Sequence, residues 1–176
     1  MERSFEVTGV VAACLSVAAL TLAVLTTGGI RIGAPYALSL LAFVLLVVLF
    51  AISEVWHQRT RTDREAIQTA FRRLPEPTRW TVRALIAICV LVAVGSFLGG
   101  GKLQSTTTVG DHYYVYDLKP TNGPKVEVSY ADYETVLMRE ERLMLATGGA
   151  FYAGIAYRSL ATGELRRTQP WRRRSR

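Results

Sequence analysis

The chain has 176 residues, of which 50% are hydrophobic, and a formal net charge of +7. This length leaves room for one domain, and hydrophobic residues gathered into long uncharged blocks point away from an ordinary soluble fold. The basic residues are concentrated at the ends of those blocks, which predicts contact with lipid headgroups and no nucleic-acid partner.

Three stretches contain no charged residue, namely residues 7–27, 35–53 and 84–101. Uncharged apolar stretches of about 18 or more residues can cross the roughly 30 Å hydrocarbon layer as helices. A fourth, shorter apolar stretch begins at Leu143. We therefore expect an all-α membrane protein, a four-transmembrane-helix bundle that forms a single integral membrane domain over residues 1–176. The expected helices cover residues 7–27, 35–55, 81–99 and 143–161.

The first two expected helices differ in the size of their side chains. The first contains small residues such as Gly9, Ser16 and Ala23, which let helix backbones approach closely in lipid. The second is rich in leucine, valine and phenylalanine, so we expect it to face lipid.

Residues 57–79 form an expected cytoplasmic amphipathic segment. Thr62 and Glu65 have the spacing of a capping box, and Pro75 and Pro77 would stop the helix that follows. One face of this helix is apolar, built by Ala66, Ile67, Ala70, Phe71 and Leu74. We expect that face to lie on the membrane, with arginines near anionic inner-leaflet lipids. The alternative is a docking site for an acidic cytoplasmic partner.

The polar segment at residues 111–142 is expected outside the membrane. A flexible Gly/Ser/Thr tether at residues 99–108 would lead into a two-stranded hairpin and then into a helix capped by Ser129. We expect the helix to cover the hairpin face built by Tyr114, Tyr116, Leu118, Val126 and Val128. The result is a small extracytoplasmic ββα cap between the third and fourth membrane helices. Tyr113 and Val115 would then be free to bind a partner.

The helix that starts at Ser129 is expected to continue into the membrane as the fourth span. Small residues recur every four positions in its apolar half, which predicts a packing face at Ala146, Ala150 and Gly154. Gly95 and Gly99 form a second candidate packing pair, in the third helix. A basic cytoplasmic tail covers residues 158–176, and its first residue, Arg158, would snorkel to the interface.

The distribution of charge predicts the topology. Residues 54–83 carry a net charge of +3 and residues 158–176 carry +6, whereas residues 102–142 carry −2. Short arginine-rich segments resist translocation, so both termini are expected to be cytoplasmic in a multi-pass protein of the cell membrane. Arginine outnumbers lysine eighteen to three, an imbalance typical of GC-rich bacterial genomes.

Motifs for chemistry are scarce. The two histidines, His57 and His112, fall on opposite sides of the membrane in this topology, and no phosphate-binding loop occurs. No cofactor or metal is expected, and the chain is predicted not to be an enzyme. An enzymatic alternative would depend on Asp111, His112 or Glu141.

Two functions remain open on the sequence. The first is a non-enzymatic membrane protein whose external cap recognises a protein partner on the outer face, as an accessory subunit, sensor or immunity-type protein would. The second is an oligomeric transporter or pore subunit. Ionisable groups within membrane helices are the usual sign of a transport pathway, and the first three expected helices have none away from their ends.

Overall fold

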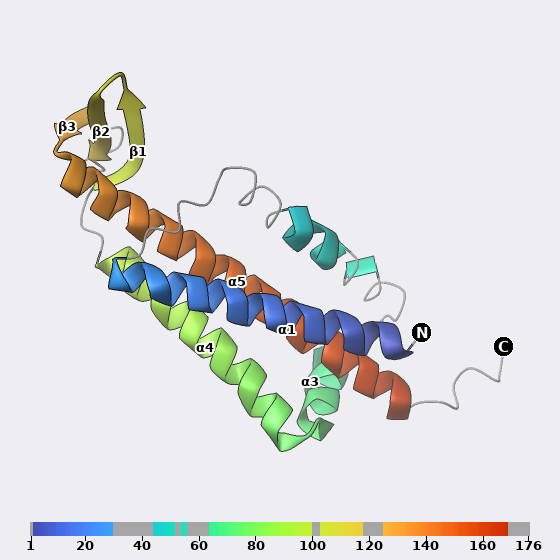
Figure 1. The fold of residues 1–176 in the computed structure, drawn as a ribbon. Helices are drawn as coiled ribbons and strands as arrows, with labels where there is room; N and C mark the ends of the chain where they lie inside the picture. Colours follow the sequence, from blue (N-terminus) through green and yellow to red (C-terminus); the bar gives the residue numbers. More distant parts are fainter. Residues whose placement is uncertain are drawn as a thin grey trace. The chain divides into compact units, whose positions relative to one another are not determined.

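A computed structural model describes residues 2–29, 44–51, 54–55, 64–99, 103–117 and 125–168. In this part the chain is mostly helical, with one small three-stranded sheet (Figure 1). The residues fall into two compact units. The first unit comprises Met1–Ala18, Ala34–Ile88 and Gly148–Arg176, and the second comprises Ala19–Gly33 and Cys89–Thr147. The single-domain organisation expected from the sequence stays a prediction.

In the first unit, residues 2–18 of α1 (Glu2–Leu25) run antiparallel to residues 148–168 of α5 (Tyr130–Thr168). Gly9 lies so close to α5 that a Cβ added there would be 2.7 Å from Cγ of Leu160. Two turns further along, the Ser16 hydroxyl donates a hydrogen bond of 2.8 Å to the carbonyl of Gly149. The buried positions of α1 recur at alternating steps of four and three residues, which is the spacing of a helix pair packed along one seam. They are Phe5, Gly9, Ala12, Ser16, Ala19 and Ala23.

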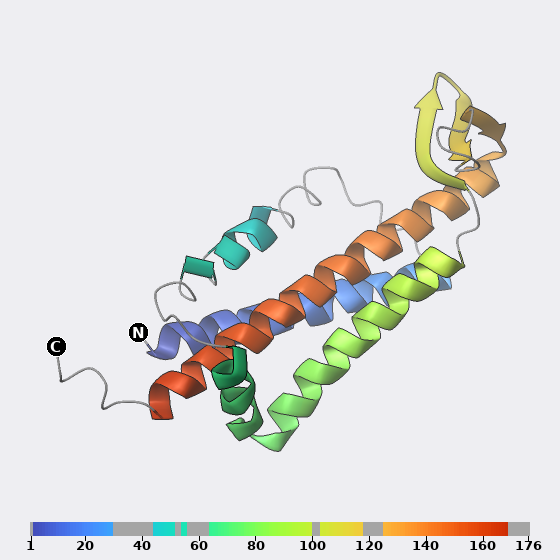
Figure 2. The same cartoon turned by 180° about the vertical axis from the view of Figure 1, so that it is seen from behind.

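Helix α3 (Arg64–Arg73) packs against protein in the first unit, beside the C-terminal part of α5 (Figure 2). Its buried Ile67, Ala70 and Phe71 form one cluster with Val82 of α4 and Ala161 of α5. The expected helix is confirmed, but the expectation that its apolar face lies on the membrane is wrong. The apolar face of α3 packs on α4 and α5 because both helices present apolar side chains to it. The predicted cap at Thr62 lies outside the described residues.

Helix α4 (Glu76–Leu98) begins earlier than the sequence predicts. Pro75 separates it from α3, whereas Pro77 lies inside its first turn. Proline is tolerated there because the first backbone N–H groups of a helix have no intrahelical acceptor. The expected start near residue 81 therefore moves back to Glu76.

Only part of the expected second membrane helix, residues 35–55, is described. Residues 44–51 and 54–55 are helical. Leu49 is buried in a cluster with Ala12 of α1 and Ile155 of α5, whereas Val44, Val47, Val48 and Phe50 are exposed. This segment therefore uses one side for packing and leaves large apolar side chains on the other.

The second unit contains an antiparallel sheet of three strands in the order β1-β2-β3. The strands are β1 (Leu103–Val109), β2 (His112–Asp117) and β3 (Lys125–Val128), and they lie beside the first turns of α5 (Figure 1). The expected two-stranded hairpin is thus one strand short. The stretch expected to be a flexible tether supplies β1, because its threonines and Val109 suit a pleated strand. Gly110, at a φ of +60°, provides the tight turn into β2.

Ser129 caps α5 as the sequence predicts. The backbone N–H of Asp132 donates to the Ser129 hydroxyl at 3.2 Å, and that hydroxyl donates to the Asp132 carboxylate at 2.7 Å. The cap satisfies one of the amide groups that a helix start leaves without an acceptor. The single continuous helix through the polar and apolar halves is confirmed, and it extends beyond residue 161 to Thr168.

Two helical segments in the described residues are long and apolar enough to cross a membrane, Ser4–Gly28 and Glu76–Leu98. In each, only 22% of the most apolar window is buried inside the structure. The core helix of a soluble protein would be mostly buried, so this exposure favours lipid contact. Helix α5 does not reach the same apolar composition, and the four-span bundle is therefore not shown.

Candidate functional site

The inner face of the sheet packs on α5. The ring of Tyr113 lies 5.0 Å, centroid to centroid, from the rings of both Tyr130 and Tyr133. Val115, one pleat further along β2, is fully buried. The prediction that Tyr113 and Val115 face a partner is wrong about their exposure, since both take part in the packing of the cap.

Strand register explains this reversal. Tyr113 pairs with Val128 and Val115 pairs with Val126, so these four residues share one face of the sheet. Alternation in the sequence alone predicts both valines on the face of Tyr114 and Tyr116 instead. A shift of one residue in register exchanges the two faces, and the long connection between β2 and β3 does not specify register as a two-residue turn would.

The outer face of the sheet is the opposite surface, and it is polar and aromatic. It is built by His112, Tyr114, Tyr116, Lys125 and Glu127. Nδ1 of His112 lies 2.6 Å from Oε1 of Glu127, with both side chains more than half exposed. Nζ of Lys125 lies 5.6 Å from the ring centroid of Tyr116, within the range of a cation–π contact. Donors, acceptors and aromatic surface therefore lie together on the outer face of the sheet.

One turn of α5 holds the sheet and the end of α1. Arg139 donates to the carbonyl of Leu103 at the start of β1, and the Thr106 hydroxyl lies 3.5 Å from the Glu140 carboxylate. Arg142 donates to Thr26, the first residue of the 3₁₀ turn (Thr26–Gly28) that continues α1, to its carbonyl at 2.8 Å and to its hydroxyl at 3.1 Å. The last carbonyls of a helix have no intrahelical donor and attract a cation, so Arg142 caps α1. No signal in the sequence pairs Arg142 with Thr26.

The predicted small-residue packing sites are used unevenly. Ala146 is buried, but a Cβ added at Gly95 or Gly154 would meet no described atom within 4 Å. At Gly99 the added Cβ would approach only the carbonyl of Gly95, at 3.0 Å, in its own helix. Ala150 is half-buried.

The close approach to α1 uses other small residues of α5. Gly149 supplies the carbonyl bound by Ser16, Ala156 is fully buried, and Gly163 would bring an added Cβ to 3.4 Å from Phe5. These three residues are spaced by seven, and this spacing in the sequence indicates one face of a packed helix. The spacing of four at Ala146, Ala150 and Gly154 defines a different set of residues.

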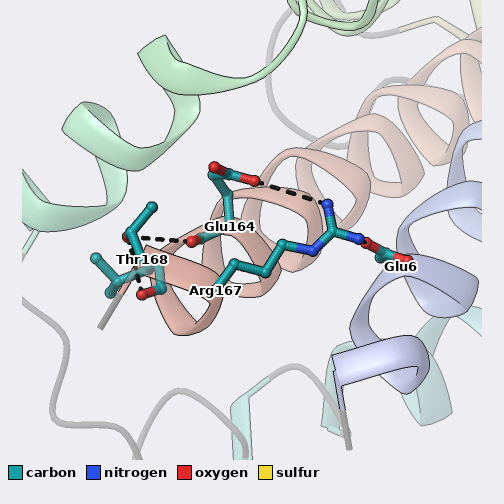
Figure 3. Close-up of polar contacts among 5 residues, drawn as sticks. Glu6, Glu164, Arg167 and Thr168 are labelled. Atoms are coloured by element: carbon teal, nitrogen blue, oxygen red, sulfur yellow. Dashed lines mark hydrogen bonds and ion pairs between the residues drawn. The ribbon is translucent and has the colours of Figure 1, made fainter. Parts of the chain in front are cut away.

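Ion pairs join distant helices in the first unit (Figure 3). Arg167, near the end of α5, pairs with Glu6 of α1, and it lies 3.9 Å from Glu164 of its own helix. Arg158, expected to snorkel, lies 3.2 Å from the carboxylate of Glu54. Each arginine therefore has a carboxylate partner, as a charged group held among packed helices requires.

Within the described ranges, no group of three or more His, Cys, Asp or Glu side chains is arranged to hold a metal ion. His112 is paired with Glu127, and one carboxylate oxygen of Glu141 is buried without a hydrogen-bond partner in this part of the chain. His57 lies outside it. No protein-family model, curated protein or solved structure matches the chain.

Proposed function

We propose that the chain is a non-enzymatic, multi-pass integral membrane protein that recognises a protein partner through the outer face of its sheet. It would act as an accessory subunit, a sensor or an immunity-type protein. The observation that carries the proposal is that the two faces of the sheet have different roles. Tyr113 and Val115 fix it to α5, which leaves Tyr114, Tyr116 and Lys125 on the other face.

The membrane assignment is supported by the exposed apolar surfaces of α1 and α4. In the proposed arrangement, residues 35–55 and 143–161 add two further spans, and both termini are cytoplasmic in the cell membrane. The charge distribution supports this orientation, because the first unit contains the basic helix α3 and the arginines near the end of α5. The second unit contains the acidic segment around the sheet, which we place outside the cytoplasm.

The composition of the outer face supports a protein as the ligand. Tyrosine offers a large contact area and a hydroxyl at little cost in side-chain entropy, and tyrosine is enriched among residues that dominate binding energies. Lys125 and Glu127 add one charge of each sign, which favours a polar protein surface over a uniformly charged polymer.

Site-specific photo-crosslinking in native membranes tests the proposal. A photoreactive phenylalanine analogue would replace Tyr114 or Tyr116, and the matched control would carry it at Thr135, an exposed position of α5 near the sheet. We expect both tyrosine positions to capture the same protein, and Thr135 to capture it much less. Absence of a discrete adduct from positions 114 and 116 would contradict partner recognition by this face.

The same experiment separates the alternative. Gly95 and Gly99 lie on an exposed side of α4, where an oligomeric transporter or pore subunit would place its subunit contact. A photoreactive residue at Val94 of that helix would then give adducts between two copies of the chain. We expect no such adducts.

A further inference from the structure

The connection between α3 and α4 forms a compact basic corner, which we call the arginine corner. Its five members are Arg72, Arg73, Arg79, Trp80 and Arg83. All of them belong to the first unit. Residues 64–83 contain five arginines and two acidic residues, Glu65 and Glu76, so their net charge is +3.

Arg79 holds the arginine corner in shape. Its guanidinium donates to the carbonyl of Arg72 at 2.9 Å, at the C-terminal end of α3, and lies 3.7 Å from Glu76. The backbone N–H of Arg79 also donates to the carbonyl of Pro75 at 3.1 Å. Proline restricts the backbone of this turn, and the buried Phe71 and Val82 anchor its two sides. The corner is therefore formed before any ligand arrives.

The other three arginines remain available. Arg72, Arg73 and Arg83 are exposed, and none of them pairs with a carboxylate in the residues that the structure describes. The guanidinium carbon of Arg83 lies 5.7 Å from the ring centroid of Phe71, which directs it over the α3 side of the corner. Guanidinium groups bind phosphate oxygens with two parallel hydrogen bonds, which a lysine ammonium does not provide.

The position of Trp80 indicates at which level of the membrane the arginine corner lies. Trp80 is 64% exposed, and it lies one turn before the uncharged part of α4 begins at Ala84. In a membrane-crossing α4, that turn falls at the level of the lipid headgroups, where an amphipathic tryptophan ring is favoured. Arg72, Arg73 and Arg83 then meet the lipid phosphates.

We propose that the arginine corner is a binding site for the phosphate headgroups of anionic lipids in the cytoplasmic leaflet. This inference rests on one part of the proposed function, namely that α4 crosses the membrane. The exposed indole beside the arginines favours a lipid over a nucleic acid, because a soluble polyanion would leave that apolar surface in water.

Tryptophan quenching in nanodiscs tests the site on the full chain. In a background carrying Trp56→Phe and Trp171→Phe, Trp80 is the remaining tryptophan and is excited selectively over the tyrosines. We expect brominated phosphatidylglycerol, mixed into phosphatidylcholine, to quench Trp80 more than brominated phosphatidylcholine at the same fraction. Replacing Arg72, Arg73 and Arg83 with glutamine should remove this preference, with a loss of about fivefold in relative affinity per arginine.

The charge-matched control carries Arg172→Gln, Arg173→Gln and Arg174→Gln in the tail. We expect it to retain the preference for phosphatidylglycerol. An equal loss in both triple variants would overturn the site, because general attraction by positive charge would then explain the binding. Tighter binding of a DNA oligonucleotide than of phosphatidylglycerol vesicles at physiological salt, lost in the corner variant, would also overturn it.

Two further readouts separate this proposal from the proposed function. Thermal unfolding shows whether the corner variant is folded, which its exposed positions predict. Photo-crosslinking from Tyr116 in that variant should still capture the partner. Lost lipid preference with retained capture supports the site, and retained lipid preference overturns it whatever happens to capture. Extraction of the chain from membranes by alkaline carbonate would contradict the membrane assignment itself.

Discussion

Helices α4 and α5 differ in the side chains that they expose and bury. Helix α4 exposes large apolar side chains, with Leu91 at 70% and Leu98 at 75% exposure. Along its apolar part, α5 exposes two large hydrophobic residues, Met144 and Phe151, and many of the residues that it buries are small, such as Ala153 and Ala156. Residues that meet lipid are chosen for hydrophobicity, whereas residues that meet another helix are chosen for size.

This difference explains why α5 is less apolar than α1 or α4. Glycine, alanine, serine and tyrosine lower the average hydrophobicity of residues 143–161, but they permit the contacts seen at Gly149 and Leu160. A helix enclosed by other helices does not need an apolar surface on every side. The composition of α5 is thus compatible with the proposed fourth span, provided that its neighbours cover it.

The largest expected effect comes from placing a large side chain on the packed seam. Gly9→Leu would force atoms against Leu160, where even a Cβ would come within 2.7 Å, and should destabilise the protein by about 3 kcal/mol. Gly95→Leu on α4 is the matched control, since its Cβ would meet no described atom within 4 Å, and its effect should be small. Thermal and denaturant unfolding in detergent would measure both. Equal effects would show that the two glycines are not distinguished by packing.

An intermediate effect is expected where α5 caps α1. Arg142→Met removes two hydrogen bonds to Thr26 and the favourable charge at a helix C-terminus, at a cost of about 2 kcal/mol. Hydrogen exchange should become faster at residues 24–28. Arg73→Met is the control, because Arg73 is exposed and the same change of charge there should leave that exchange unaltered. Protection that is unchanged in Arg142→Met would refute the cap.

The smallest effect concerns the hydrogen bond inside the seam. Ser16→Ala removes the bond to the Gly149 carbonyl, and interhelical hydrogen bonds in membrane proteins contribute about 0.6 kcal/mol on average. Ser96→Ala in α4 removes a hydroxyl that donates at 2.7 Å to the Val92 carbonyl of the same helix. Unfolding should distinguish the two, with a loss in Ser16→Ala and little change in Ser96→Ala. A reversed order would argue against the α1–α5 contact.

Much of the helical structure could be predicted because helix signals are local. The apolar stretches, the Ser129 cap and the face of Ile67, Ala70 and Phe71 all follow from residue types at short spacing. The candidate partner surface could not be predicted, because alternation along β2 shows that two faces exist but not which one is buried. That choice depends on pairing with Val126 and Val128, which belong to another strand.

The sequence by itself determined which segments are apolar, where the helix at Ser129 starts, and where the positive charge is concentrated. These properties depend on neighbouring residues and on their transfer between water and an apolar medium. Only the tertiary structure decided that α3 packs on protein, that residues 103–109 join the sheet, and that Gly9 and Gly149 mark the α1–α5 seam. In each case, segments distant in the chain compete as packing partners, and the steric fit between whole elements decides which of them pack together.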